Sequence, residues 1–167
     1  IYGDRCGKNA IVNNSVSFNG GHGIFLYGAA PCAIDGNLII SNGIDGMFLR
    51  YLSNSTVKKN FVSGNNGCGI YFYSDEDPER PSGLSRNNLI RDNHVLNNSC
   101  GIKISHFGMD VSPSQNDIYG NLIAVNSFGL NIFGSNGNAF YNNNFVNNSK
   151  QLFVYESFNN TWDGGYY

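Results

Sequence analysis

Two side chains of this sequence are candidates for acid–base chemistry. Lys103 and His106 lie three residues apart, and a lysine or a histidine can abstract the proton beside the carboxylate of a uronate sugar. Sugar hydrolysis instead needs two carboxylates about 5–9.5 Å apart, and no pair of acidic residues recurs through the chain. We therefore favour a chain without catalytic activity, in which Lys103 and His106 are solvated surface residues.

The densest group of acidic residues runs from Asp75 to Asp77. Carboxylate oxygens bind Ca²⁺, which makes Asp75 and Asp77 candidate metal ligands. Consecutive side chains of an extended segment point in alternating directions, however, so they rarely reach one ion. Pro78 and Pro81 indicate a stiff, hydrated loop instead. We expect no bound metal and no cofactor.

The elements that position these residues come from a motif that recurs six times. It reads Asn, four residues, Asn, about three residues to a Gly, and then an apolar–x–apolar triplet, as in Gly69-Ile70-Tyr71-Phe72. The Asn pairs are Asn14/Asn19, Asn37/Asn42, Asn60/Asn65, Asn93/Asn98, Asn121/Asn126 and Asn143/Asn148. Where the unit carries no insertion, its length is 22 or 23 residues. A fixed period of this kind is typical of a solenoid.

The unit is too short for a pair of helices and fits one coil of β-strands. Apolar positions alternate, as at Ile70 and Phe72, with the period of two that marks a strand. Stacked coils place equivalent residues about 4.8 Å apart. Side-chain amides can then bond from coil to coil, and Asn tolerates the left-handed backbone of tight corners. We predict a single-domain, right-handed parallel β-helix of about six coils over residues 1–167. A leucine-rich repeat shares the period but needs leucine spacings that are missing here.

Two coils carry insertions, at residues 74–83 and 107–114. Both follow the strand after the repeat Gly, so we expect them to protrude side by side at one edge. Insertions in solenoids often lie on the binding face.

The four cysteines occupy positions that predict disulfides. Cys68 and Cys100 each precede the repeat Gly in neighbouring coils, and stacked equivalents fall within the Cα separation of about 4.4–6.8 Å that a disulfide needs. Cys6 and Cys32 can also meet on adjacent coils. We predict Cys68–Cys100 and Cys6–Cys32, with four buried thiols as the alternative.

Composition and sequons favour an exported chain. The net charge of −2 suggests no nucleic-acid partner, and no apolar run is long enough for a transmembrane helix. The candidate glycosylation sites are Asn13, Asn54, Asn97, Asn147 and Asn159, each of which begins Asn-x-Ser/Thr. Together with disulfide spacing, these triplets predict an extracellular or cell-surface location.

Outward positions of the strand after the repeat Gly carry many aromatic residues. Two residues past the Gly, or past Gln151, stand Phe25, Phe48, Tyr71, Lys103, Asn131 and Phe153. Four residues past it stand Tyr27, Arg50, Tyr73, Ser105, Phe133 and Tyr155. We take as binding candidates Phe25, Tyr27, Phe48, Arg50, Tyr71, Tyr73, Phe133, Phe153 and Tyr155. A contiguous aromatic patch marks an interface or a binding groove. Three interpretations stay open: packing against another subunit or domain, glycan binding, and a loop folded over the ladder.

The C-terminal segments carry a resemblance to a known group. Residues 142–151 read NNNFVNNSKQ, and residues 159–167 read NNTWDGGYY. They resemble the closing segment of NosD-like right-handed β-helix proteins, a group of carbohydrate-binding and sugar-hydrolase-type β-helices. The resemblance implies an archaeal surface protein, of which this chain is a fragment. NosD-type proteins assist copper-enzyme maturation, but the histidines and methionines here form no close-spaced soft-ligand cluster, and we expect no copper site.

These observations predict a structural or adhesive β-helix module of a cell-surface or secreted assembly. Its partners would be other protein subunits or domains, reached through the aromatic ladder. The alternative is a carbohydrate-binding or polysaccharide-cleaving β-helix that uses the same face for glycans.

Overall fold

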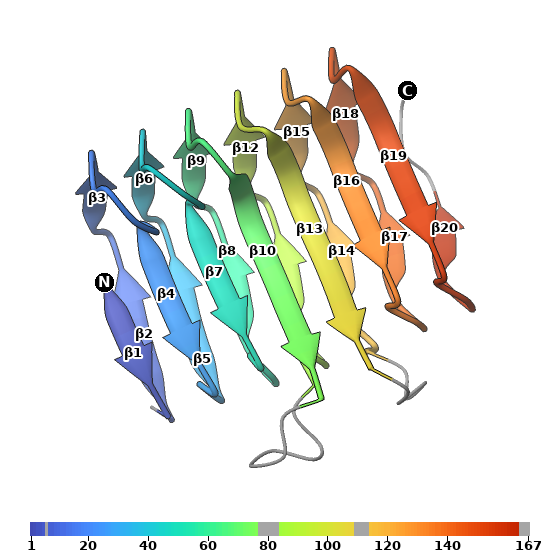
Figure 1. Cartoon of the computed structure of the whole chain (residues 1–167), viewed down its shortest axis with the longest axis horizontal. Helices are drawn as coiled ribbons and strands as arrows, with labels where there is room; N and C mark the ends of the chain where they lie inside the picture. Colours follow the sequence, from blue (N-terminus) through green and yellow to red (C-terminus); the bar gives the residue numbers. More distant parts are fainter. Residues whose placement is uncertain (6, 77–83, 109–113, 164–167) are drawn as a thin grey trace.

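The computed structural model is a parallel β-helix in which successive coils lie side by side along the long axis (Figure 1). It describes residues 1–5, 7–76, 84–108 and 114–163. Within these ranges every regular element is a β-strand, and every strand pairing is parallel. None of the described segments is a helix long and apolar enough to cross a membrane. The predicted fold class is confirmed, and the leucine-rich alternative is wrong.

In the described residues, three parallel sheets wrap the core, two of seven strands and one of six. Successive coils contribute one strand to each sheet, except that the described part of the last coil contributes to only two of them. Sheet A contains β1 (Tyr2–Asp4), β4 (Ile24–Tyr27), β7 (Met47–Arg50), β10 (Cys68–Asp75), β13 (Cys100–Phe107), β16 (Phe128–Phe133) and β19 (Lys150–Tyr155). Sheet B contains β2 (Asn9–Val12), β5 (Cys32–Asp35), β8 (Thr56–Lys58), β11 (Leu89–Arg91), β14 (Asp117–Tyr119), β17 (Ala139–Tyr141) and β20 (Thr161–Asp163). Sheet C contains β3 (Ser15–Ser17), β6 (Leu38–Ile40), β9 (Phe61–Ser63), β12 (His94–Leu96), β15 (Leu122–Ala124) and β18 (Asn144–Val146).

The core lies inside the coil. Each sheet contributes one or two columns of inward-facing side chains to it. Ile70 and Phe72 of β10 are fully buried, whereas Tyr71 between them is half-buried on the outer face. The same columns continue through neighbouring strands, because Ile70 pairs in register with Met47 and Ile102. Full burial of one such aliphatic side chain contributes about 1.5–3 kcal/mol relative to exposure. Because the alternating apolar side chains must be buried, the period of two fixes which face of each strand points outward.

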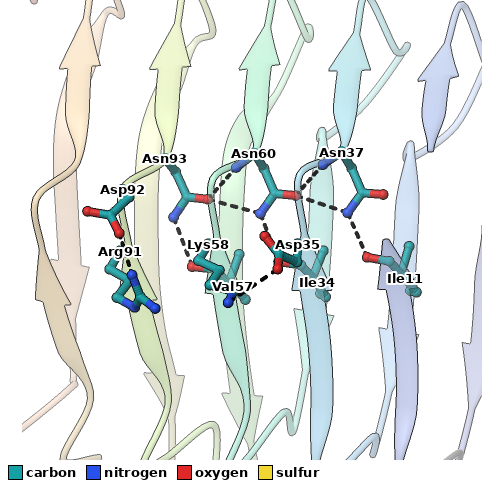
Figure 2. A network of polar contacts seen from close by, with 10 residues as sticks. All are labelled: Ile11, Ile34, Asp35, Asn37, Val57, Lys58, Asn60, Arg91, Asp92 and Asn93. Carbon is teal, nitrogen blue, oxygen red and sulfur yellow. Dashed lines mark hydrogen bonds and ion pairs between the residues drawn. The ribbon is translucent and has the colours of Figure 1, made fainter. Parts of the chain in front are cut away.

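Asparagine ladders hold the corners together (Figure 2). Asn37 donates to the side-chain oxygen of Asn60 from its backbone N–H (2.9 Å) and from Nδ2 (3.0 Å). Asn60 does the same to Asn93 and also donates from Nδ2 to the backbone oxygen of Ile34. The second Asn of the repeat forms an equivalent ladder, as between Asn42 and Asn65. Both predicted ladders are present.

A third ladder runs along the corner between sheets A and B. It continues from Asn88 through Asn116 and Asn138 to Asn160. The left-handed backbone is not found at the ladder residues themselves. It falls on the residue before each one, as at Asn87 (φ 55°) and Asn142 (φ 53°). That residue turns the chain, and the ladder Asn then faces inward to bond.

The repeat glycines lie where coils approach most closely. A Cβ at Gly46 would come within 2.6 Å of the Gly69 carbonyl oxygen and 2.6 Å of Val62 Cγ1. A Cβ at Gly23, Gly69, Gly101 or Gly129 would also come within 2.7 Å of a backbone or side-chain atom, so close packing requires glycine at these positions.

Both insertions leave the same edge of sheet A, because Asp75 and Phe107 are register partners at the ends of β10 and β13. Most of the insertions, residues 77–83 and 109–113, lies outside the described residues, as does the metal candidate Asp77.

Candidate functional site

The outer face of sheet A carries the predicted aromatic columns in direct register. The first column is Tyr2, Phe25, Phe48, Tyr71, Lys103, Asn131 and Phe153. The second column is Asp4, Tyr27, Arg50, Tyr73, Ser105, Phe133 and Tyr155. The structure therefore brings all nine predicted binding residues onto one face.

Many of these rings stack on one another along the axis of the solenoid. Tyr2 and Phe25 are 5.2 Å apart with 9° between their planes, and Phe25 and Phe48 are 5.4 Å apart with 19°. At the other end, Phe133 stacks on both Phe107 (4.6 Å) and Tyr155 (5.4 Å). Both faces of Phe25 and of Phe133 are thus covered by neighbouring rings. In the middle of the face, Tyr71 instead meets Phe48 and Tyr73 edge to face.

A charged cluster occupies the middle of the face. Arg50 Nη2 donates to both carboxylate oxygens of Asp75, at 2.9 and 3.0 Å. The hydroxyls of Tyr51 and Tyr73 donate to the same carboxylate. The Arg50 guanidinium also lies 4.9–5.6 Å from the ring centroids of Tyr27, Tyr51 and Tyr73. Because Asp75 is occupied by four hydrogen bonds, it is a poor ligand for a metal ion, and the described residues contain no group of three metal-ligating side chains.

The two catalytic candidates do not converge. Residues three apart on a strand point to opposite sides, so Lys103 lies on the outer face and His106 points inward, 7% exposed. Lys103 Nζ sits 4.6 Å from the centroid of Tyr71. Burial raises the pKa of Tyr71, whose hydroxyl bonds to Ser105 at 2.9 Å, so this tyrosine stays protonated at neutral pH. The geometry offers no acid–base pair at this place, and the expectation that His106 is a solvated surface residue is wrong.

A family model described as "right handed beta helix region" matches residues 1–145. The chain belongs to this family. Searches of curated proteins and of solved structures found no match. The family match agrees with the parallel coil of strands seen in the structure.

The right-handed β-helix has a hollow of about 430 Å³ at the edge of sheet A where β13 and β16 end. Phe107, Phe133 and Phe158 form its apolar wall, and Asn136 and Glu156 supply polar groups. No residue pattern in the sequence predicted this hollow. Phe158 and Glu156 follow the last repeat triplet, and nothing in their spacing signals that they lie beside β13.

The two cysteines of the β-helix that precede a repeat Gly lie at the start of sheet A strands. Cys68 and Cys100 are register partners at the first positions of β10 and β13, as predicted. Both carry free thiols in this structure, so the disulfide between them stays a prediction. Cys6 lies outside the described residues, and the Cys6–Cys32 pairing also stays a prediction.

The same column contains an acid and a histidine that the sequence analysis did not pair. Asp45 is buried, and its Oδ1 accepts a hydrogen bond from the Cys68 backbone N–H at 2.6 Å. His22 Nδ1 lies 3.1 Å from Asp45 Oδ2. Burial raises the pKa of Asp45, although the Cys68 N–H and His22 oppose this shift. Each of these residues precedes a repeat Gly, a signal that could have revealed the pair.

The five sequon asparagines lie at exposed turns of the β-helix. All have positive φ angles, from 50° at Asn54 to 56° at Asn13. All five side chains are exposed, so the folded chain offers each of them to solvent. Their glycosylation remains a prediction.

Proposed function

We propose that this right-handed β-helix is a structural or adhesive module of a cell-surface or secreted assembly, with the outer face of sheet A as its contact surface. The observation that carries the proposal is the stacking of the rings. Sugar rings pack on exposed aromatic faces, whereas here the faces of Phe25 and Phe133 are covered by neighbouring rings. A contiguous patch of rings that already pack on one another suits another protein surface better.

The size of the face fits this role. Seven strands spaced about 4.8 Å apart make the sheet about 30 Å wide, and strands of about five residues are about 17 Å long. Each copy then offers roughly 500 Å² of surface, and a pair of copies buries about 1,000 Å², the lower limit for a specific interface.

The charges of the face also permit contact with a second copy. Arg50 is neutralised by Asp75, and Lys103 covers Tyr71. The partner that these features fit is another subunit with the same face, because symmetric pairing is the commonest form of oligomer. The exposed sequon turns and the NosD-like C-terminal motif support an extracellular or surface setting.

Sedimentation velocity over a concentration series tests the proposal. We expect the wild-type chain to self-associate and Phe48→Ser to weaken association at least tenfold. Phe61→Ser is the matched control, because Phe61 is an exposed aromatic residue on sheet C. A wild-type chain that stays monomeric up to its solubility limit, or equal effects of the two substitutions, would refute the proposal.

Glycan binding is a second candidate, favoured by the hollow near β13 rather than by the ladder. Its three phenylalanines, an amide and a carboxylate are groups that suit a sugar. A glycan array should then show binding that Glu156→Gln weakens and Phe48→Ser leaves intact. Cleavage of the glycan is a weaker version, because Lys103 and His106 point to opposite sides of β13.

A further inference from the structure

The thiols of Cys68 and Cys100 lie within reach of each other. The two residues are register partners on neighbouring parallel strands, which are about 4.8 Å apart and so within the Cα range of a disulfide. Bond formation therefore needs side-chain rotation and no change of register.

The two thiols differ in access to solvent. Cys100 is 6% exposed, and its Sγ lies 3.5 Å from the backbone oxygen of Ile102. Cys68 is only partly buried, at the start of β10. A reagent in solution thus reaches Cys68 first.

The surroundings of Cys68 slow this reaction at neutral pH. The hydrogen bond to Cys100, burial and the negative charge of Asp45 raise the pKa of the Cys68 thiol above its usual range, and Lys103 opposes them. His22 contacts Asp45 and belongs to the same column. Because the thiolate is the attacking species, exchange should accelerate as the pH rises.

We propose that Cys68 and Cys100 form a dithiol site that a small-molecule disulfide oxidises, with Cys68 attacking and Cys100 resolving. The Cys68 thiolate attacks one sulfur of the oxidant, forms a mixed disulfide and releases one thiolate. The Cys100 thiol then loses its proton and attacks the Cys68 sulfur, which releases the second thiolate. The two cysteines lose two electrons and two protons, and the oxidant is reduced to two thiols.

The resulting bond would lock β10 to β13 beside the contact face. Tyr71 and Lys103, which lie three residues after the two cysteines, belong to that face. The site is independent of the proposed function, since it requires no partner.

Oxidised glutathione added to the phosphine-reduced full chain tests the proposal. A tryptic digest under non-reducing conditions should join residues 60–86 to residues 92–103. Cys100→Ser should stop at a stable mixed disulfide on Cys68, and Cys68→Ser should leave Cys100 unmodified until denaturant is added. The rate should rise about tenfold from pH 7 to pH 8, as the thiolate fraction does below the pKa.

Circular dichroism of both variants is the control for the fold, and only variants with the wild-type spectrum are compared. Equal modification of Cys68 and Cys100 in the two folded single variants would overturn the assigned order. A second pair of results would overturn the dithiol site itself. In that case the Cys100→Ser variant is glutathionylated at pH 8, but the wild-type chain gives no joined peptides.

Discussion

Removal of one ladder amide, by Asn60→Ala, should destabilise the whole solenoid. Asn60 is 1% exposed and lies in the middle of its column (Figure 2). Its Oδ1 accepts from the backbone N–H and the Nδ2 of Asn37, and its Nδ2 donates to the backbone oxygen of Ile34. Alanine leaves these three groups without that partner in a corner that water does not reach.

The magnitude follows from the three groups. A buried polar group that loses its partner costs about 1–3 kcal/mol. The Asn37 backbone N–H loses its acceptor outright, whereas Asn37 Nδ2 keeps its bond to the Ile11 oxygen, so the substitution should lower the free energy of unfolding by about 2–3 kcal/mol. Domains are stable by only about 5–15 kcal/mol, which makes this a large fraction of the total.

Urea unfolding followed by circular dichroism measures the loss. Asn14→Ala is the matched control, because Asn14 is the exposed first member of the same column and donates to Asn37 in the same way. Water can replace its bonds, and we expect a loss of about 0.5 kcal/mol or less. Equal losses in the two variants would refute the claim that buried ladder bonds hold the coils together.

Three further predictions concern the repeat glycines and the residues that directly precede them. Gly46→Ala should lower the free energy of unfolding by about 1–3 kcal/mol by overpacking. Gly20→Ala should leave it nearly unchanged, since a Cβ there meets nothing within 4 Å. Similar falls in the melting temperature of the two variants would contradict this prediction. The raised pKa of Asp45 means that the folded state binds its proton more tightly than the unfolded state, whose pKa is near 3.8. The stability that this provides is present below pH 3.8 and is lost as the pH rises through the folded pKa. Asp45→Asn should therefore gain in melting temperature relative to wild type between pH 3 and pH 7, and a relative fall would sink the argument. Oxidation that joins Cys68 to Cys100 should raise the free energy of unfolding by about 3–4 kcal/mol through loop closure, measured against Cys68→Ser, which should show no rise on the same treatment.

Much of the fold was predictable because the repeat combines two simple periods. The spacing of the Asn pairs predicts the length of one coil, and the alternation in triplets such as Ile70–Phe72 predicts which face of the strand is buried. The third ladder was missed, although Asn88 precedes Asn93 by the same five residues that separate Asn93 from Asn98. The spacing of five residues therefore marks all three ladders in the sequence.

The candidate site was predictable only in part. The period of two places Phe48 and Phe133 on the outer face, but it says nothing about ring orientation, which depends on side-chain rotamers and on the ring in the next coil. The same period shows that Lys103 and His106 point to opposite sides, once both are known to lie in one strand. The hollow near Phe158 depends on how the last coil meets β13, and spacing carries no information about that.

Oxidative footprinting at low and high protein concentration tests the central claim most directly, because it reports the exposure of individual rings. If the outer face of sheet A is the contact surface, Phe25, Phe48 and Tyr73 should lose reactivity as the chain associates, and Phe61 on sheet C should keep its own. Protection of Phe61 with unchanged reactivity of Phe48 would contradict the account.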